Sequence, residues 1–239
     1  MIATARLAAE SIGKSFGKRQ VLNSASLWVY PGSVTALVGR NGQGKSTLFK
    51  IAAGLMRPDF GMIRMEDDRF VRVRQADMAR RGVFFLPELG HSLLCRSFTI
   101  RDHLRATEYH FGSENIDRAV QLLRIGDFLD RLPHTLSGGE RRRAELAMAV
   151  ARGPSCLLAD EPFLGVVPTD REFLTELFRN LSRDGCAVAI TGHEVQSLFD
   201  AADDVLWMTG GTTHALGTPA DARSNDQFVR EYLGIEALR

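Results

Sequence analysis

The chain has 239 residues, of which 44% are hydrophobic and 25% are charged, and its formal net charge is +1. This length and composition favour one large domain, or one domain with an inserted lobe, built on a substantial core. Because 30 basic residues are balanced by 29 acidic ones, the chain lacks the overall positive field that attracts nucleic acid, and we expect no nucleic-acid partner.

Targeting signals are not evident in the sequence. No apolar run approaches the roughly 18 residues of a membrane-spanning helix, and Met1 to Ala9 is broken by Arg6 without a secretory core. Cys95, Cys156 and Cys186 are odd in number and lack C-x-x-C spacing, so we expect buried thiols in a reducing compartment. A soluble, cytoplasmic protein is therefore expected.

The N-terminal part of the chain predicts strands. Apolar or alternating runs are punctuated by Pro31-Gly32 as a turn, by Asp67-Asp68 as a connection between two short strands, and by Pro87 as the end of a buried strand. The predicted strands cover residues 7–12, 21–30, 34–38, 62–65, 70–73 and 83–86.

The segment Gly39-Arg40-Asn41-Gly42-Gln43-Gly44-Lys45-Ser46-Thr47 fits the phosphate loop G-x-x-x-x-G-K-[ST], between a predicted strand and a predicted helix over 46–55. Its glycines let backbone N–H groups converge on one anion, and the helix adds its positive end. Lys45 would then reach the β- and γ-phosphates, while Ser46 would hold Mg²⁺. A glycine turn with a solvated lysine is the alternative, which this context disfavours. The predicted nucleotide-binding residues here are Gly39, Asn41, Gly42, Gly44, Lys45, Ser46 and Thr47.

Residues 88 to 152 have a helical texture, with capping-box spacing at Thr99 to Asp102. After Pro154 the pattern returns to strand, helix and strand over 156–159, 170–183 and 186–191. The order predicts an α/β fold with an inserted helical block.

Two further clusters could bind phosphate or metal. Ser137-Gly138-Gly139 precedes a predicted helix and could expose N–H groups as a second anion site, although on the tripeptide alone a simple helix cap is the better interpretation. Asp160 and Glu161 end a buried strand, where Asp160 suits a Mg²⁺ ligand and Glu161 suits a base that orients water. His193 follows another strand and would face the same crevice, unless it is an ordinary half-buried histidine.

Leu136-Ser137-Gly138-Gly139-Glu140, followed by three arginines, resembles the signature sequence of ATP-binding-cassette (ABC) ATPases. Residues 156–162 look like the Walker B strand of that family, His193 stands at its switch histidine, and Gly210-Gly211 and Gly217-Thr218-Pro219 resemble its closing strand and turn. The resemblance covers essentially the whole chain. It implies an α/β, RecA-like P-loop ATPase core with an N-terminal antiparallel β-subdomain and an inserted α-helical subdomain.

The resemblance also assigns segments and roles. It implies one ABC ATPase domain over 1–239, with the core over 1–88 and 153–222, the helical subdomain over 89–152, and a C-terminal tail over 223–239. His193 would bond the γ-phosphate, and Phe16 matches the aromatic residue that stacks on adenine, although a core residue at a strand end is an equal alternative.

Two positions depart from the family pattern. Glu88 stands where most members have a glutamine that senses Mg²⁺ and the membrane partner; its carboxylate can still bind a hard cation. Val167 stands where the family usually has an aspartate that reaches across a dimer interface. We therefore hypothesise weaker coupling between two ATP sites.

Membership would imply an ATPase that binds ATP and Mg²⁺, works as a homodimer clamping two ATP molecules, and drives transport through separate integral-membrane subunits at the inner face of the cell membrane. Leu89 to Arg105 is the expected docking surface. Residues 160–165 and 228–234 resemble the subgroup for branched-chain amino-acid uptake or lipopolysaccharide export.

Functions other than transport are alternatives for this family. A soluble ABC-type ATPase of iron–sulfur cluster assembly shares the signature but has an acidic loop where this chain has Val166-Val167. DNA-repair and translation-factor relatives carry coiled coils or two cassettes, which this sequence lacks. A catalytically silent structural subunit is a further alternative, because Val167 replaces the usual aspartate.

Overall fold

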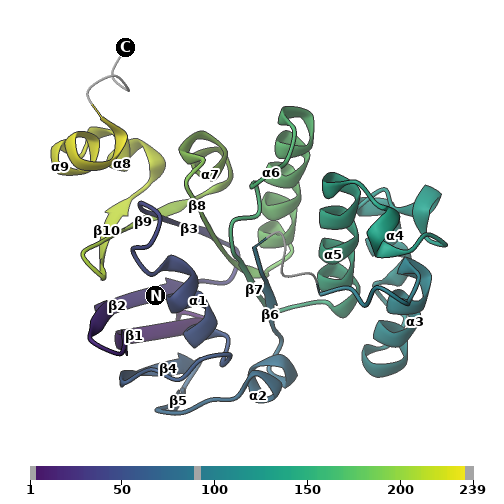
Figure 1. The fold of residues 1–239 in the computed structure, drawn as a ribbon, viewed down its shortest axis with the longest axis horizontal. Helices are drawn as coiled ribbons and strands as arrows, with labels where there is room; N and C mark the ends of the chain where they lie inside the picture. Colours follow the sequence, from purple (N-terminus) through teal and green to yellow (C-terminus); the bar gives the residue numbers. More distant parts are fainter. Residues whose placement is uncertain (1–3, 89–92, 235–239) are drawn as a thin grey trace.

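The computed structural model describes residues 4–88 and 93–234, which form two sheets with helices around them (Figure 1). The larger sheet has the strand order β10-β9-β3-β8-β7-β6 and the smaller one has the order β2-β1-β4-β5. One apolar core cluster packs the helical side of the large sheet, and a second lies between the two sheets.

The large sheet contains the parallel neighbours β3 (Val34–Val38), β8 (Ala187–Gly192), β7 (Cys156–Ala159) and β6 (Val83–Leu86). β9 (Asp204–Thr209) lies parallel to β3, and β10 (Thr212–Gly217) closes the sheet antiparallel to β9. Strands β3, β7 and β8 are buried along their whole length, as expected for strands covered on both faces. Their carboxyl ends meet at one edge, where parallel sheets bind ligands.

The smaller sheet is antiparallel and contains β1 (Leu7–Phe16), β2 (Arg19–Val29), β4 (Phe60–Met65) and β5 (Asp68–Phe70). The prediction of a strand over 70–73 after an Asp67-Asp68 connection is wrong, because Asp68 already pairs with Met65 and the turn lies earlier. Glu66 makes that turn with a φ of 51°.

Helix α1 (Lys45–Ala52) lies between the sheets and buries Leu48, Phe49 and Ile51. Helix α2 (Gln75–Arg80), which the sequence pattern did not reveal, buries only Met78. Its ion pairs Arg74–Asp77 and Arg80–Asp77 are exposed and of i,i+3 spacing.

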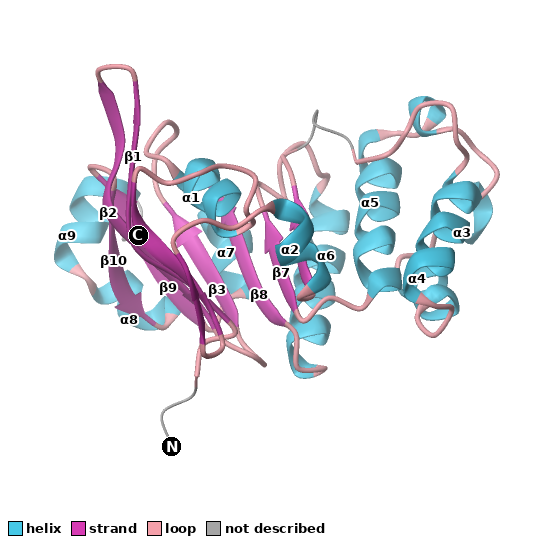
Figure 2. Ribbon diagram, turned by 90° about the horizontal axis from the view of Figure 1, so that it is seen from below, coloured by secondary structure: helices cyan, strands magenta, loops and turns pink. Residues whose placement is uncertain are grey.

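A helical block stands beyond β6 and β7, on the side away from β10 (Figures 1 and 2). It contains α3 (Ile100–Phe111), α4 (Ile116–Leu122), α5 (Gly138–Arg152) and the short 3₁₀ turns η1 (Gly126–Phe128) and η2 (Pro133–Thr135). The capping box predicted at Thr99 and Asp102 is present, and Ser137 with Glu140 forms a second one at the start of α5.

The C-terminal part adds α6 (Pro168–Arg183), α7 (Val195–Ala201), α8 (Pro219–Ser224), α9 (Asp226–Phe228) and a π-helical turn, η3 (Val229–Leu233). Within the described ranges, every helix is too short or too polar to cross a membrane. Cys156 and Cys186 are buried as expected, but Cys95 is exposed, so the expectation of a buried thiol is wrong there.

Candidate nucleotide site

A pocket of about 410 Å³ opens where the carboxyl ends of β3, β7 and β8 meet the N-terminus of α1. It gathers residues that the sequence predicted as a site, together with three that it did not. The lining residues are Arg19, Val21, Asn41, Gly42, Gly44, Lys45, Ser46, Thr47, Glu88, Glu161, Leu164 and His193.

The loop between β3 and α1 needs its glycines for conformation and for space. Gly42 and Gly44 have φ values of 80° and 106°, which disfavour a side chain. A Cβ on Gly39 would lie 2.6 Å from the carbonyl oxygen of Met208, so only glycine fits against β9 there. Helix α1 begins without a side-chain cap or an acidic residue in its first turn. Its N-terminus therefore offers backbone N–H groups to an anion.

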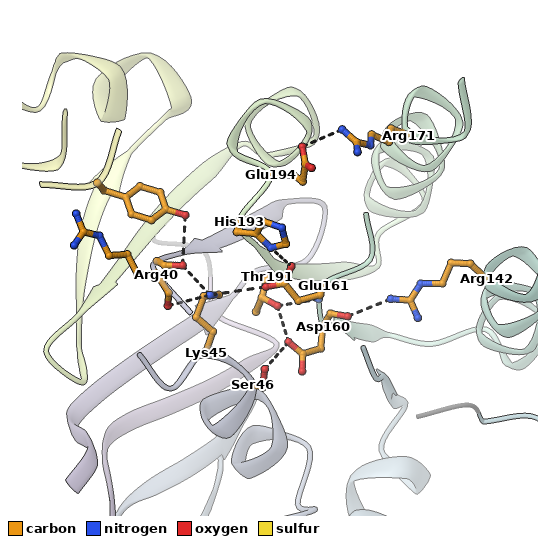
Figure 3. A network of polar contacts seen from close by, with 12 residues as sticks. Arg40, Lys45, Ser46, Arg142, Asp160, Glu161, Arg171, Thr191, His193 and Glu194 are labelled. Atoms are coloured by element: carbon orange, nitrogen blue, oxygen red, sulfur yellow. Dashed lines mark hydrogen bonds and ion pairs between the residues drawn. The ribbon is translucent and has the colours of Figure 1, made fainter. Parts of the chain in front are cut away.

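The ammonium of Lys45 lies inside this loop. It donates to the carbonyl oxygens of Gly39 at 2.7 Å and Arg40 at 3.4 Å, and its Nζ is 3.8 Å from Glu161 Oε1 (Figure 3). Burial lowers the pKa of Lys45, while the nearby carboxylates of Glu161, Asp160 and Glu88 oppose that shift. A buried cation at the start of α1 is well suited to bind phosphate.

Ser46 and Asp160 supply hard oxygen atoms at the floor of the site. The Ser46 hydroxyl donates to Asp160 Oδ1 at 3.0 Å, and Thr191 donates to the same oxygen at 2.7 Å. Asp160 is only 1% exposed, so its carboxylate is held by hydroxyls rather than by water. A hydroxyl, a buried carboxylate and the pocket-lining Glu88 form a donor set that fits Mg²⁺, which binds few protein oxygens and keeps several waters.

Glu161 and His193 form the wall opposite the loop. His193 Nδ1 lies 2.9 Å from Glu161 Oε2, and the backbone N–H of Glu161 donates to Thr191 Oγ1 at 3.0 Å. Glu161 has a φ of 47°, in the left-handed region that costs a non-glycine residue about 1–2 kcal/mol. Such strain, held in place by the Thr191 bond, aims the carboxylate into the pocket and is typical of functional positions.

Four residues of the site were not predicted from the sequence. Leu164 lines the pocket just after Glu161, and Arg19, Val21 and Thr191 come from β2 and β8. Arg19 reaches to 3.7 Å from the position that a Cβ on Gly42 would occupy, and with Val21 it forms the pocket wall supplied by β2. Thr191 closes the predicted strand next to Asp160 in space, but a threonine at a strand end carries no sequence signal of its own.

Six predicted residues are outside the pocket lining: Gly39 and Asp160, which bond the lining residues Lys45 and Ser46, and four others. Phe16 ends β1, is 48% exposed and lies beneath the Lys14 ammonium, 5.8 Å from its ring centre. Ser137, Gly138 and Gly139 begin α5 outside the pocket lining, and the Ser137 hydroxyl caps the helix by accepting from the Glu140 N–H at 3.2 Å. Within this chain Ser137 is the N-cap of α5, and Gly138 and Gly139 are the first two residues of the helix. The part of the expected docking surface over residues 89–92 lies outside the described residues.

Known proteins resemble this chain along nearly its whole length. A family model described as ABC transporter matches residues 22–164. The lipopolysaccharide export system ATP-binding protein LptB of Haemophilus influenzae is 33% identical over 95% of this chain and 97% of its own length. The protein of the same name from Escherichia coli is 32% identical over 96% of this chain and 98% of its own length.

Solved structures agree in fold. The ADP conformation of an ATP-binding cassette of an ABC transporter has a TM-score of 0.84 at 23% identity, covering 98% of this chain and 100% of that one. An ATP binding subunit of an ABC transporter has a TM-score of 0.80 at 27% identity, covering 95% of each chain. The matches support a transport subunit over the iron–sulfur assembly alternative. The chain thus belongs to the ABC transporter family, as an ATP-binding and ATP-hydrolysing subunit with the α/β cassette fold.

Proposed function

We propose that this chain hydrolyses Mg²⁺-ATP as a homodimer at the cytoplasmic face of a membrane and thereby drives transport through separate membrane subunits. The observation that carries this proposal is the network of hydrogen bonds and one ion pair that joins Lys45, Ser46, Asp160, Glu161 and His193, through Thr191, around one pocket (Figure 3). Phosphoryl transfer to water needs positioning and charge neutralisation, and these groups can supply both.

Each side chain has a role that its position supports. Lys45 would donate to the β- and γ-phosphates, while Ser46 and Asp160, with Glu88 at the pocket wall, would hold the metal. Mg²⁺, when bound, neutralises charge on those phosphates. Glu161 would orient the attacking water and His193 would contact the γ-phosphate, as their shared contact at the pocket favours.

A second copy of the chain would complete the site. Ser137, Gly138 and Gly139 present the capped N-terminus of α5 but line no part of the pocket of their own chain. Pairing would bring this helix start against the triphosphate in the partner's pocket. A structural neighbour of 20% identity is titled as a dimeric post-hydrolysis state of an ATP-binding cassette bound to ADP and Pi, which supports dimerisation as a property of this fold.

Membrane subunits are proposed to dock on the helical subdomain, residues 89–152. Its exposed face includes Leu93 and Phe98, which are 43% and 54% exposed, close to Glu88 in sequence. The relatives named for lipopolysaccharide export make a lipid exporter the first system in which to seek the partner.

Two measurements test the proposal. The purified chain should hydrolyse ATP in Mg²⁺ but not in excess chelator, with a specific activity that rises with protein concentration because the active form is a pair. Membrane subunits of a transporter should copurify with the tagged chain from its own cells. A specific activity independent of concentration would contradict the homodimer, and activity in chelator would contradict the metal site. No activity under any condition would favour the silent-subunit alternative.

A further inference from the structure

Thr191 is a fully buried polar residue near the end of an apolar strand. On β8 it follows alanine, valine, alanine and isoleucine, which are all buried as well. A buried hydroxyl costs free energy unless it is hydrogen-bonded, whereas a valine of similar shape would need no partner. The contacts of the hydroxyl should therefore explain why a threonine stands at this position.

Both hydrogen-bonding capacities of the Thr191 hydroxyl are used within the nucleotide site (Figure 3). Its Oγ1 accepts from the backbone N–H of Glu161 at 3.0 Å and donates to Asp160 Oδ1 at 2.7 Å. Because a backbone N–H can only donate, the single proton of the hydroxyl is left for the Asp160 carboxylate. One side chain thus joins the two acidic residues that follow β7, with the direction of each bond fixed.

The bond to Asp160 holds its carboxylate beside Ser46. The Ser46 hydroxyl donates to the same Oδ1 atom at 3.0 Å, so two hydroxyls, from α1 and β8, hold one oxygen. A hydroxyl can bind a cation through its lone pairs while its proton stays on a carboxylate, so these bonds need not change when a metal binds. Asp160 Oδ2 has no hydrogen-bond partner among the residues that the structure describes, and it remains for the metal or a metal-bound water.

The bond from Glu161 holds a strained backbone. Glu161 has a φ of 47°, and its carboxylate lines the pocket and lies 2.9 Å from His193 Nδ1. Such a backbone persists only where its surroundings hold it in place. Without an acceptor for its buried N–H, Glu161 would be free to move towards an ordinary φ, and the direction of its carboxylate would change with it.

We infer that Thr191 is a positioning residue of the ATP site, whose one hydroxyl orients both the metal-binding carboxylate and the carboxylate that orients water. It is fully buried and outside the pocket lining, so it acts through Asp160 and Glu161 rather than on the nucleotide. The inference rests on the roles proposed above for those two residues and not on the proposed homodimer.

The test is Thr191→Val, which removes the hydroxyl and keeps a branched side chain of similar size. Loss of a residue that orients a metal ligand typically costs about 10–100-fold in metal affinity or activity, so kcat at saturating Mg²⁺-ATP should fall by about that factor. The Kd for a non-hydrolysable ATP analogue, measured by calorimetry, should rise about tenfold in Mg²⁺. In chelator it should stay within twofold of the wild type, because the loop and the start of α1 bind phosphate without the metal.

Two variants serve as controls. Thr191→Ser keeps the hydroxyl, so it should retain kcat and the Kd in Mg²⁺ to within about twofold. Thr35→Val is the matched control, because Thr35 is also buried, on the neighbouring strand β3 at the end away from the pocket, and its hydroxyl bonds the carbonyl oxygen of Trp28 at 3.4 Å. It should leave kcat and both Kd values unchanged, whatever its effect on the urea midpoint.

Three results would overturn the inference. The first is a Thr191→Val protein with kcat and the Kd in Mg²⁺ within twofold of the wild type. The second is an equal rise of the Kd in Mg²⁺ and in chelator, which would mark Thr191 as a support of the fold alone. The third is a folded Thr191→Ser protein as impaired as Thr191→Val, which would assign the loss to packing.

The test remains decisive in two further cases. If the valine variant does not fold, Thr191→Ala takes its place, because it also lacks the hydroxyl and adds no bulk. If the wild type does not hydrolyse ATP, the proposed function fails, whereas the two Kd values still support or overturn the role of Thr191.

Discussion

The guanidinium of Arg142 donates to the backbone carbonyl oxygen of Asp160 at 3.1 Å, from a position only 1% exposed. The same side chain donates to the carbonyl oxygen of Pro87 at 2.8 Å and pairs with Glu145 at 3.2 Å. It thus connects helix α5, which begins with Ser137, to the strand end that holds Asp160 and to the segment that carries Glu88. Through Arg142 the helical block is therefore bonded directly to the strand end that carries Asp160.

Arg142→Met should destabilise the protein by about 3–5 kcal/mol, because it leaves the buried Glu145 carboxylate without its cation. Adding Glu145→Leu should recover part of that loss, since the orphaned charge is then also removed. Urea unfolding at pH 7 measures both values.

Arg101→Met is the control for this prediction. Arg101 makes a two-pronged pair with Asp130 at 2.6 and 2.9 Å, but on an exposed surface. Exposed ion pairs of this kind contribute about 0–1 kcal/mol to the free energy of unfolding. Equal losses for Arg101→Met and Arg142→Met would show that burial of the Arg142 network does not matter.

Lys45→Met should impair ATP binding and should also change how the stability of the nucleotide-free protein depends on pH. Burial lowers the pKa of Lys45, so its charged form is disfavoured in the folded state. That destabilisation is complete below the lowered pKa and disappears as the pH rises towards the usual value of 10.5. The urea midpoint of Lys45→Met, relative to that of the wild type, should therefore fall as the pH rises from 7 to 10. Lys50→Met, at the other end of α1, is the control; a difference in midpoint that stays constant with pH would contradict this account.

The local patterns predicted the central part of the site well. Local sequence predicted the strand, glycine loop and helix around Lys45, and also the buried strand before Asp160. In these segments the local preferences of neighbouring residues agree with the fold. Helix α2 was missed because it has six residues and one buried side chain, too few for a periodic signal.

Contacts between distant segments could not be predicted in the same way. Tyr232 and Gly39 are separated by 193 positions, and only the folded tail brings them together. Phe16 matched a family position in the sequence, but the ring is paired with Lys14 and lines no part of the pocket. The left-handed backbone at Glu161 also depends on its partner Thr191, 30 residues later.

Val167→Ser should stabilise the protein by about 0.5–1 kcal/mol, because α6 begins at an N-cap without a side-chain hydrogen bond. A serine there could accept from the N–H of Asp170, which already bonds the Val167 carbonyl at 3.0 Å. The capping boxes at Thr99, Ser137 and Thr218 show this arrangement elsewhere in the chain. Val71→Ser, at an exposed site outside any helix start, controls for the loss of a valine; equal thermal midpoints for the two variants would reject the capping argument.

Val167→Asp should raise the Hill coefficient of ATP hydrolysis, because valine cannot accept a hydrogen bond from a second chain and aspartate can. Val167 is 57% exposed in the single chain and is therefore accessible to a partner. Val167→Ser is the control for the helix cap. Serine can cap α6 as aspartate can, but its shorter side chain reaches less far towards a second chain. An unchanged Hill coefficient for Val167→Asp would contradict the coupling hypothesis.

The central claim is that Mg²⁺-ATP in the Lys45 pocket joins two copies of this chain, and Glu161→Gln tests it most directly. The substitution keeps the size of the side chain but removes the carboxylate proposed to orient water, so ATP should bind without being hydrolysed. Light scattering after gel filtration should then show a dimer with Mg²⁺-ATP and a monomer without nucleotide or with ADP. A Glu161→Gln protein that hydrolyses ATP at the wild-type rate, or that stays monomeric when saturated with Mg²⁺-ATP, would contradict the account.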